Sequence, residues 1–330
     1  MQPHSRKPSS PDSTLWTTCN EAPPYPPLDI NSVRCDSEHV VSDEYERLRG
    51  LLRAYGSCLV AYSGGVDSAF LAYVAHEVLG DKSLAAIADS PSLPRRELEE
   101  ALDLARQFKF PVRVLHTREF ESASYLANPD NRCYFCKHEL FKELAPLAKA
   151  EGFAVIAYGE NASDLGDYRP GAQAAAEFQV RAPLKEAGLT KANIRALSAQ
   201  LGLPTADKPQ MACLSSRVPY GEPVTPQKLG MIERAENILR DLGFYDIRVR
   251  HHELRRSELL STLNPQPSTV LHLARIEVGP AEMRKFLEDG TSVKVAAALK
   301  QIGYAHVTLD LQGYRRGSAN ELIKTADSAS

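Results

Sequence analysis

The stretch LVAYSGGVDSAFLAYVAHEVLG, residues 59–80, decides the fold of this 330-residue chain. Its first four residues are an apolar run typical of a buried strand, and the pattern from Val66 predicts a helix that ends at Gly80. Between them, Ser-Gly-Gly-Val-Asp-Ser predicts a tight turn, in which two glycines let the backbone approach a ligand without a Cβ. The stretch therefore predicts a strand, a glycine-rich turn and a helix in succession.

On both sides of this unit, strand and helix patterns alternate. Strands are predicted at 57–62, 83–88, 112–117 and 154–159, and helices at 44–56, 66–80, 94–108, 133–152 and 191–202. Such alternation indicates an α/β fold with a doubly wound parallel sheet. The polar segment GENASDLGDYRPGAQ, residues 159–173, follows the last of these strands, where such sheets bind ligands.

The pattern changes near residue 217. Helices predicted at 225–243, 281–290 and 292–303 and strands at 246–252, 274–278 and 306–311 indicate a smaller α+β domain. The first 37 residues are rich in Pro, Ser and Thr and have no apolar period, which is typical of disorder. We therefore expect a disordered extension at 1–37, the α/β domain at 38–216, the second domain at 217–320 with an inserted surface loop at 253–272, and a flexible tail at 321–330.

The composition is that of an ordinary globular protein, with 43% hydrophobic and 25% charged residues and a net charge of -3. This balance gives no electrostatic sign of nucleic-acid binding. No apolar run is long enough to cross a bilayer, and the N-terminus has no apolar region of a secretory signal. We expect a cytoplasmic protein with no membrane contact. Its six cysteines are too few for disulfide bonds to be the main source of stability, so their role has to be inferred from their spacing.

The glycine-rich turn is suited to an anion. The helix that begins near Val66 presents free N–H groups and the positive end of its dipole. Ser63 and Ser68 add hydroxyl donors, and Asp67 is placed to hold Mg²⁺ against phosphate oxygens. The loop lacks the lysine that usual nucleotide loops extend to the β- and γ-phosphates, which favours attack at the α-phosphate with pyrophosphate as the leaving group. The predicted cradle is Ser63, Gly64, Gly65, Val66, Asp67 and Ser68.

The turn with its flanking strand and helix resembles the SGGxDS signature of the PP-loop ATP pyrophosphatases. The structural alternative is a strand-to-helix turn whose glycines only permit close packing. The resemblance implies that the protein uses ATP with Mg²⁺, adenylates an oxygen of its substrate and releases pyrophosphate.

Three further segments narrow the resemblance: NRCYFCKHELF (131–141), GENASDLGDYRPG (159–171) and DKPQMACLSSRVPYGEPVTPQKL (207–229). With RVRHH, ARIEV and VTLDLQGYRRGSAN, they resemble the LarE family of ATP-dependent sulfur transferases over residues 42–320. The resemblance implies adenylation of a carboxylate of pyridinium-3,5-dicarboxylate mononucleotide and its conversion to a thiocarboxylate. This reaction is a step in building the nickel-pincer nucleotide cofactor of lactate racemase.

The cysteine pattern separates two classes within that family. One class sacrifices the sulfur of a single cysteine, at the position of Cys213, and the other adds a CxxC motif and holds an iron–sulfur cluster on three cysteines. This chain has Cys133, Cys136 and Cys213, so it resembles the 4Fe-4S class, with Cys213 and Asp67 as the catalytic residues. Three thiolates leave one iron without a protein ligand, where an extra sulfide would be held for transfer.

The spacing of the CxxC motif is compatible with metal binding. Cys133 and Cys136 fall in the first turn of a predicted helix, so their sulfurs share a face, and the helix N-terminus is expected to lower their thiol pKa. A CxxC motif alone is weak evidence for a cluster, because buried thiols, a redox pair and half of a zinc site are together more common. Zinc on the three cysteines with His138 is one alternative. Cys58, inside the first strand, is interpreted as a small packed hydrophobe.

An anionic mononucleotide needs donors for phosphate and carboxylate, and a guanidinium binds either group in a bidentate way. Because His251 and His252 alternate on a strand, at most one of them can point into a given site. Solvated surface charges and ordinary loop residues are the structural alternative for each polar candidate. The predicted substrate contacts are Asn161, Asp164, Asp167, Arg169, Ser216, Arg217, Arg250 and Glu277.

The resemblance implies a homo-oligomer with transient contacts to other nickel-pincer biosynthesis proteins. Two other functions remain open from the sequence. A PP-loop enzyme that thiolates tRNA would use the same activation but needs a basic, aromatic-lined surface, which the charge balance and single tryptophan disfavour. A non-catalytic module would hold structural zinc on the three cysteines.

Overall fold

The computed structural model describes residues 42–164, 170–209, 212–255 and 270–315, all within one compact unit. The predicted extension at 1–37, the tail at 321–330, and the site candidates Asp167 and Arg169 lie outside the described residues. For Arg255 only the backbone is described.

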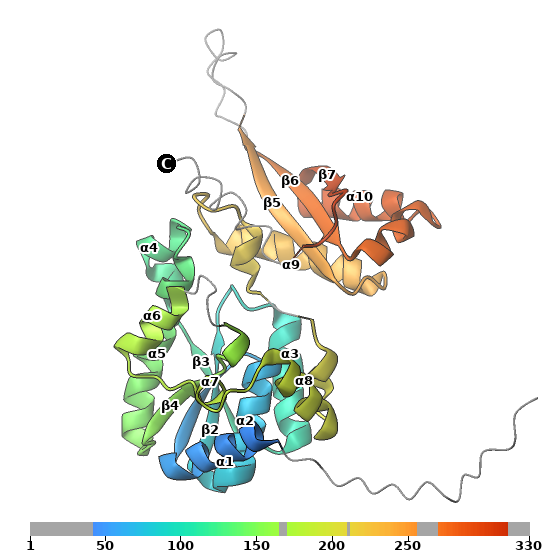
Figure 1. The fold of residues 1–330 in the computed structure, drawn as a ribbon. Helices are drawn as coiled ribbons and strands as arrows, with labels where there is room; N and C mark the ends of the chain where they lie inside the picture. The colour runs from blue at the N-terminus through green and yellow to red at the C-terminus, as the bar shows by residue number, and fades with distance from the viewer. Residues whose placement is uncertain (1–41, 165–169, 210–211, 256–269, 316–330) are drawn as a thin grey trace, which may run out of the picture. The chain divides into compact units, whose positions relative to one another are not determined.

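The first sheet is parallel and carries the glycine-rich turn. Its strands are β1 (Cys58–Tyr62), β2 (Ser83–Asp89), β3 (Val112–His116) and β4 (Val155–Tyr158), in the order β3-β2-β1-β4 (Figure 1). β1 pairs with β2 on one side and with β4 on the other. The strand order therefore reverses at β1, and the loops that follow β1 and β4 diverge at the ligand-binding edge of the sheet.

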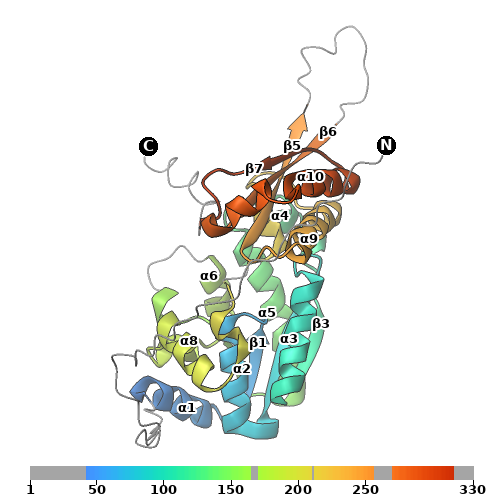
Figure 2. The ribbon, with the colours of Figure 1, turned by 90° about the vertical axis from the view of Figure 1, so that its right-hand side faces the viewer.

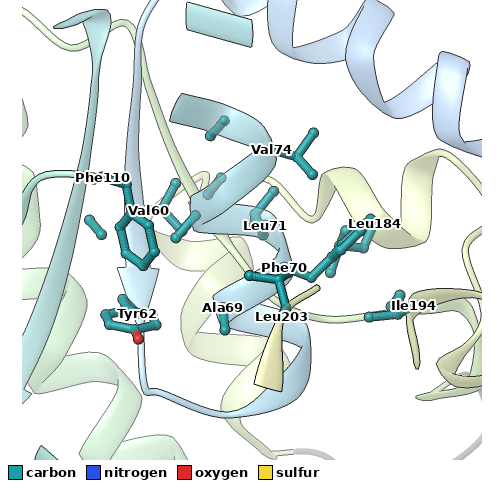
Figure 3. Packing of buried hydrophobic residues seen from close by; sticks show 14 of the residues in the cluster. Val60, Tyr62, Ala69, Phe70, Leu71, Val74, Phe110, Leu184, Ile194 and Leu203 are labelled. Carbon is teal, nitrogen blue, oxygen red and sulfur yellow. The ribbon is translucent and has the colours of Figure 1, made fainter. Parts of the chain in front are cut away.

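Helices cover both faces of this sheet (Figure 2). One face packs against α1 (Asp43–Tyr55), α2 (Val66–Leu79), α3 (Arg95–Phe108), α7 (Pro183–Glu186) and α8 (Lys191–Gln200), and the other against α5 (Arg132–Glu151) and α6 (Pro170–Glu177). Along β1, Val60 and Tyr62 pack on the face covered by α2 (Figure 3), whereas Leu59 and Ala61 pack on the face covered by α5 and α6. Every residue of β1 is buried, which confirms the predicted doubly wound α/β class.

The second sheet consists of β5 (Ile247–Arg255), β6 (Val270–Val278) and β7 (Tyr304–Leu309). β5 and β6 are antiparallel, and β6 and β7 are parallel. The helices α9 (Pro226–Asp241) and α10 (Thr291–Ile302) cover one face, which buries Val249, Ile276 and Leu299. This smaller mixed sheet matches the expected α+β character, and we propose the boundary between the two domains near Arg217.

Several elements differ from their predictions. β5 and β6 extend three residues into each end of the segment 253–272, because Arg255 pairs with Val270; residues 256–269 lie outside the described residues. Residues 280–287 form a 3₁₀ helix rather than an α-helix, and α6 begins inside the polar segment predicted as a loop. A short helix, α4 (Ala123–Leu126), precedes α5 and was not predicted.

Candidate active site

A cavity of about 480 Å³ lies beside the turn after β1 and the loop after β4. Its wall combines residues that are far apart in the sequence: Asp67 and Ser68 of the turn, Cys133 and Lys137 of α5, Asn161 after β4, and Lys191 of α8. Ser63, Gly65, Val66 and Asp164 also line it. The structure therefore brings the predicted phosphate cradle and one cysteine of the CxxC motif to the same space.

The shape of the turn depends on a glycine, which permits its backbone conformation, and on a serine, which hydrogen-bonds across it. Gly64 has a φ of 70°, and a Cβ there would lie 2.8 Å from Cβ of Ala101. Ser68 accepts a hydrogen bond from the Ser63 N–H at 3.1 Å and donates to the Gly65 carbonyl at 3.2 Å. Because these bonds close the turn from within, the first N–H groups of α2 remain directed outward for an anion.

Gly159 brings the loop after β4 against the turn. A Cβ at this position would lie 2.9 Å from the backbone nitrogen of Ser68. The absence of a side chain thus permits the two loops to meet at the point where the strand order reverses. The glycine of this loop is a packing requirement of the site.

Asp67 has two carboxylate oxygens in different environments. Oδ2 lies 2.6 Å from Nζ of Lys191, whereas Oδ1 is buried and has no hydrogen-bond partner among the described residues. An orphaned carboxylate oxygen beside a phosphate cradle fits a hard divalent cation, so Asp67 is a suitable Mg²⁺ ligand.

Lys191 is a site residue that sequence reasoning missed. It is the first residue of α8, after the N-cap Thr190, and a cation there opposes the helix dipole. That unfavourable position was the available signal. Lys137, on α5, was also missed; its ammonium lies 5.6 Å from the ring centroid of Tyr158.

The loop after β4 is organised by its own polar side chains. The Asn161 N–H donates to Oδ2 of Asp164 at 3.2 Å, and the Ser163 N–H donates to Oδ1 of Asn161 at 2.9 Å. Glu160 is buried and pairs with Lys185 at 3.0 Å. Asn161 and Asp164 therefore shape the cavity wall through local hydrogen bonds, as Asx residues do in turns.

The three candidate cysteines come from two segments that are bound together. Cys133 and Cys136 are the second and fifth residues of α5, and Cys136 packs against the cluster that includes Leu214 and Val218. The guanidinium of Arg132 donates to the Ser215 carbonyl at 3.0 Å. These contacts place the chain that follows Cys213 against the CxxC helix.

Further buried hydrogen bonds fix the segment after Cys213. The hydroxyls of Ser92, Tyr125 and Ser215 form a closed set, with Tyr125 to Ser215 at 2.8 Å and Ser92 to Ser215 at 2.9 Å. Asn128 donates its amide to the carbonyls of Pro219 and Glu222, at 2.7 and 3.0 Å. Asn128 itself has a φ of 55° and is fully buried.

The expectation that the helix N-terminus lowers the thiol pKa is wrong. Burial raises the pKa of the Cys136 thiol far above its usual range, and the nearby Cys213 and Cys133 thiolates add to this effect. Desolvation and Cys213 likewise raise the pKa of Cys133, more than Arg132 lowers it. Desolvation and repulsion between the thiols outweigh the helix dipole, so any metal that bound here would have to displace the thiol protons.

The three candidate thiols, as the structure places them, are not arranged to share a single zinc ion. Tetrahedral zinc with Zn–S bonds of about 2.3 Å needs sulfurs roughly 3.8 Å apart. Within the described part of the chain, Cys133, Cys136 and Cys213, with or without His138, do not bring their ligand atoms within 4.8 Å of one another. The His138 ring packs on Phe178 instead, with centroids 5.0 Å apart. Burial lowers the pKa of the Arg132 guanidinium, but the nearby Cys213 and Cys133 outweigh this effect and raise it overall.

The predicted substrate arginines are buried ion-pair partners. Arg217 is fully buried, pairs with Glu236 at 2.9 Å and donates to the Cys213 carbonyl at 3.1 Å. Arg250 contacts both oxygens of Glu277, at 3.0 and 2.8 Å, and the Ser216 carbonyl at 2.8 Å.

The segment that follows Cys213 is thus in contact with a connected polar group, called here the polar group behind Cys213, which consists of Ser216, Arg217, Arg250 and Glu277. None of these four residues lines the cavity described above. Cys58, in contrast, is fully buried in β1, as expected of a packed hydrophobe.

Comparison with known proteins agrees with this architecture. Residues 42–134 match the family described as NAD synthase. An uncharacterized protein of Synechocystis is 41% identical over 86% of this chain and 99% of its own length. The pyridinium-3,5-bisthiocarboxylic acid mononucleotide synthase of Lactiplantibacillus plantarum is 33% identical over 82% of this chain and 91% of its own. The tRNA-specific 2-thiouridylase MnmA of Azorhizobium caulinodans is 28% identical over 68% of this chain and 69% of its own.

The sheet order, the SGGVDS turn and the cavity beside it define a PP-loop ATP pyrophosphatase fold. Within that class, the chain belongs to the LarE family, and it is an ATP-dependent sulfurtransferase. Among the described residues, no helix combines the length and apolar character needed to cross a bilayer.

Proposed function

We propose that this enzyme adenylates a carboxylate of pyridinium-3,5-dicarboxylate mononucleotide and replaces the AMP with sulfur, in the biosynthesis of the nickel-pincer nucleotide. The single observation that carries the proposal is the shared cavity, which is lined both by Cys133 and by the PP-loop residues Ser63, Gly65, Val66, Asp67 and Ser68. An enzyme that adenylates a carboxylate and then delivers sulfur to the carbon of that carboxylate needs ATP and the sulfur source within one cavity.

The first step requires little acid–base chemistry from the protein. The substrate carboxylate is an anion above a pKa of about 4, so one of its oxygens attacks the α-phosphorus directly. The bond from the α-phosphorus to the bridging oxygen breaks, and pyrophosphate leaves. Ser63, Ser68 and the N–H groups of α2 bind the leaving phosphates, Lys191 adds a positive charge, and Asp67 would hold Mg²⁺.

The second step exchanges AMP for sulfur at the activated carbonyl. A sulfide attacks the carbonyl carbon, the bond to the AMP oxygen breaks, and a thiocarboxylate and AMP result. When bound by Cys133, Cys136 and Cys213, a 4Fe-4S cluster would supply that sulfide from an iron that has no protein ligand. Arg132, buried beside Cys133, counters the negative charge at this place.

The polar group behind Cys213 has a positioning role in this proposal. Arg217 and Arg250 donate to the carbonyls of Cys213 and Ser216 and pair with Glu236 of α9 and Glu277 of β6, so they fix the third cysteine relative to α9 and β6. The family resemblance supports two further parts of the proposal. The protein acts as a cytoplasmic homo-oligomer, and its substrate is contacted directly by Ser216, Arg217, Arg250 and Glu277.

The test starts with anaerobically purified protein. We expect about four irons and at least four acid-labile sulfides per chain, ATP-dependent pyrophosphate release with the dicarboxylate mononucleotide, and a product one sulfur heavier in place of oxygen. Cys133→Ser, Cys136→Ser and Cys213→Ser should each lose iron. The matched control Cys58→Ala, at a buried thiol in β1, should keep it.

Other results would assign other functions. Iron-free protein that loses one sulfur from Cys213 during a single turnover would mean a sacrificial cysteine. Salt-sensitive retention and thiolation of tRNA would replace the substrate proposed here. Stoichiometric zinc without pyrophosphate release would make the chain a binding module.

A further inference from the structure

A second group of metal-ligand side chains lies in the C-terminal sheet, apart from the three cysteines. His251 and Glu253 are two residues apart on β5 and point to the same face, and His272 on β6 is the register partner of Glu253. One ligand atom of each lies within 4.8 Å of the other two. Within the described ranges, it is the one group of three His, Cys, Asp or Glu side chains that meets this distance.

The two histidines carry the decisive observation. His251 is fully buried, and its Nε2 is buried with no hydrogen-bond partner in the described part of the protein. The same holds for Nδ1 of His272, and the ring centroids are 4.8 Å apart. Buried ring nitrogens normally have partners, so two neighbouring orphans indicate an absent group that accepts lone pairs from both.

The surroundings favour a cation at this point. Nδ1 of His251 lies 3.2 Å from the Tyr304 hydroxyl. When Nδ1–H donates to that oxygen, Nε2 is left with its lone pair free, which is the outer hydrogen bond that metal-binding histidines usually make. Lys228 contacts Oε1 of Glu253 at 2.9 Å, and a carboxylate has a second oxygen that can act as a ligand.

We propose that His251, Glu253 and His272 bind one first-row divalent cation of the Zn²⁺ type. Two imidazoles and one carboxylate are a ligand set of Zn²⁺ and Fe²⁺ sites, in which a fourth position is left for solvent. The site joins β5 to β6 close to residues 256–269, so the ion would cross-link the ends of both strands. It lies on the helix-covered face, whereas Arg250 and Glu277 lie on the opposite face of the same strands.

The test uses the full chain with Cys133, Cys136 and Cys213 replaced by serine, so that the proposed cluster ligands cannot bind the probe. Equilibrium dialysis against Zn²⁺ alone should give one ion per chain, and the zinc X-ray absorption edge should indicate nitrogen and oxygen ligands without sulfur. In this background, His272→Ala and Glu253→Gln should weaken binding by more than the roughly 10- to 100-fold that loss of an outer partner costs. Tyr304→Phe, which removes only the outer hydrogen bond, should fall in that range.

His306→Ala is the matched control, because His306 is an exposed histidine of the same sheet outside the triad. It should bind zinc like the background, and circular dichroism should confirm that every variant is folded. Folded background protein that takes up no zinc, or equal affinity in the His272 and Glu253 variants, would overturn the proposal. These outcomes do not depend on sulfur transfer, so the two proposals fail or survive separately.

Discussion

The ammonium of Lys191 lies 2.6 Å from the carboxylate of Asp67, although 124 residues separate them. The sequence of the PP-loop lacks a lysine, and the fold supplies one from the start of α8. The fold therefore pairs the Mg²⁺-binding candidate with a cation, and both residues line the cavity.

Replacing Lys191 should impair ATP use. Lys191→Met removes one charge-assisted contact, worth about 1.5–3 kcal/mol, so kcat/KM for ATP-dependent pyrophosphate release should fall roughly 10- to 100-fold. Steady-state kinetics over a range of ATP concentrations measures this change. Lys142→Met is the control, because Lys142 pairs with Glu139 on the exposed side of α5, and unchanged kinetics of the Lys191 variant would remove it from the site.

Gly64 should not tolerate a methyl group. Gly64→Ala places Cβ 2.8 Å from Ala101 and imposes a φ of 70° on alanine, so we expect a loss of more than about 2 kcal/mol in unfolding free energy and of ATP binding. Gly50→Ala is the contrast: it lies inside α1 with nothing within 4 Å, and should stabilise the protein by about 0.5–1 kcal/mol. Urea denaturation compares the two.

The Arg217–Glu236 pair should make stability depend on acid. Burial alone would raise the pKa of Glu236, but Arg217 and the N–H of Val249 hold it below its ordinary value. A carboxyl with a lowered folded pKa stabilises the native state above its unfolded pKa, and this contribution is lost as the pH falls through the folded pKa. Unfolding free energy should therefore decline below about pH 4.5.

Glu236→Gln tests this assignment. At pH 7 the variant should be less stable by about 3–5 kcal/mol, because Arg217 is left buried without its charge partner. Its stability should also fall less steeply than that of the wild type between pH 5 and 3. Parallel pH profiles of the two proteins would contradict the assignment.

Asn128 should hold the Cys213 segment in place. Asn128→Ala removes buried hydrogen bonds to the carbonyls of Pro219 and Glu222, so we expect a loss of about 2–3 kcal/mol in stability and less iron per chain. Tyr125→Phe is the milder comparison, because Ser92 and Ser215 still bond each other at 2.9 Å. Equal iron content in both variants would argue against a role for this loop in metal retention.

The sequence predicted the parallel sheet and the PP-loop because both depend on local patterns. Alternating faces along Leu59, Val60, Ala61 and Tyr62 determine burial, and Gly64 determines the turn. The ends of β5 and β6 near the insertion were harder to predict from the sequence, because the pairing of Arg255 with Val270 depends on the register between residues that are distant in the chain.

What the sequence determined by itself is the chemistry of the parts: a lysine-free phosphate cradle and three cysteines in two motifs. Only the tertiary structure determined which charged side chains form ion pairs and which groups are buried. It paired Lys191 with Asp67, buried Arg217 and Arg250 against glutamates, and raised the thiol pKa of Cys136. Charge pairing and desolvation depend on distances between segments far apart in the chain, and no local pattern encodes those distances.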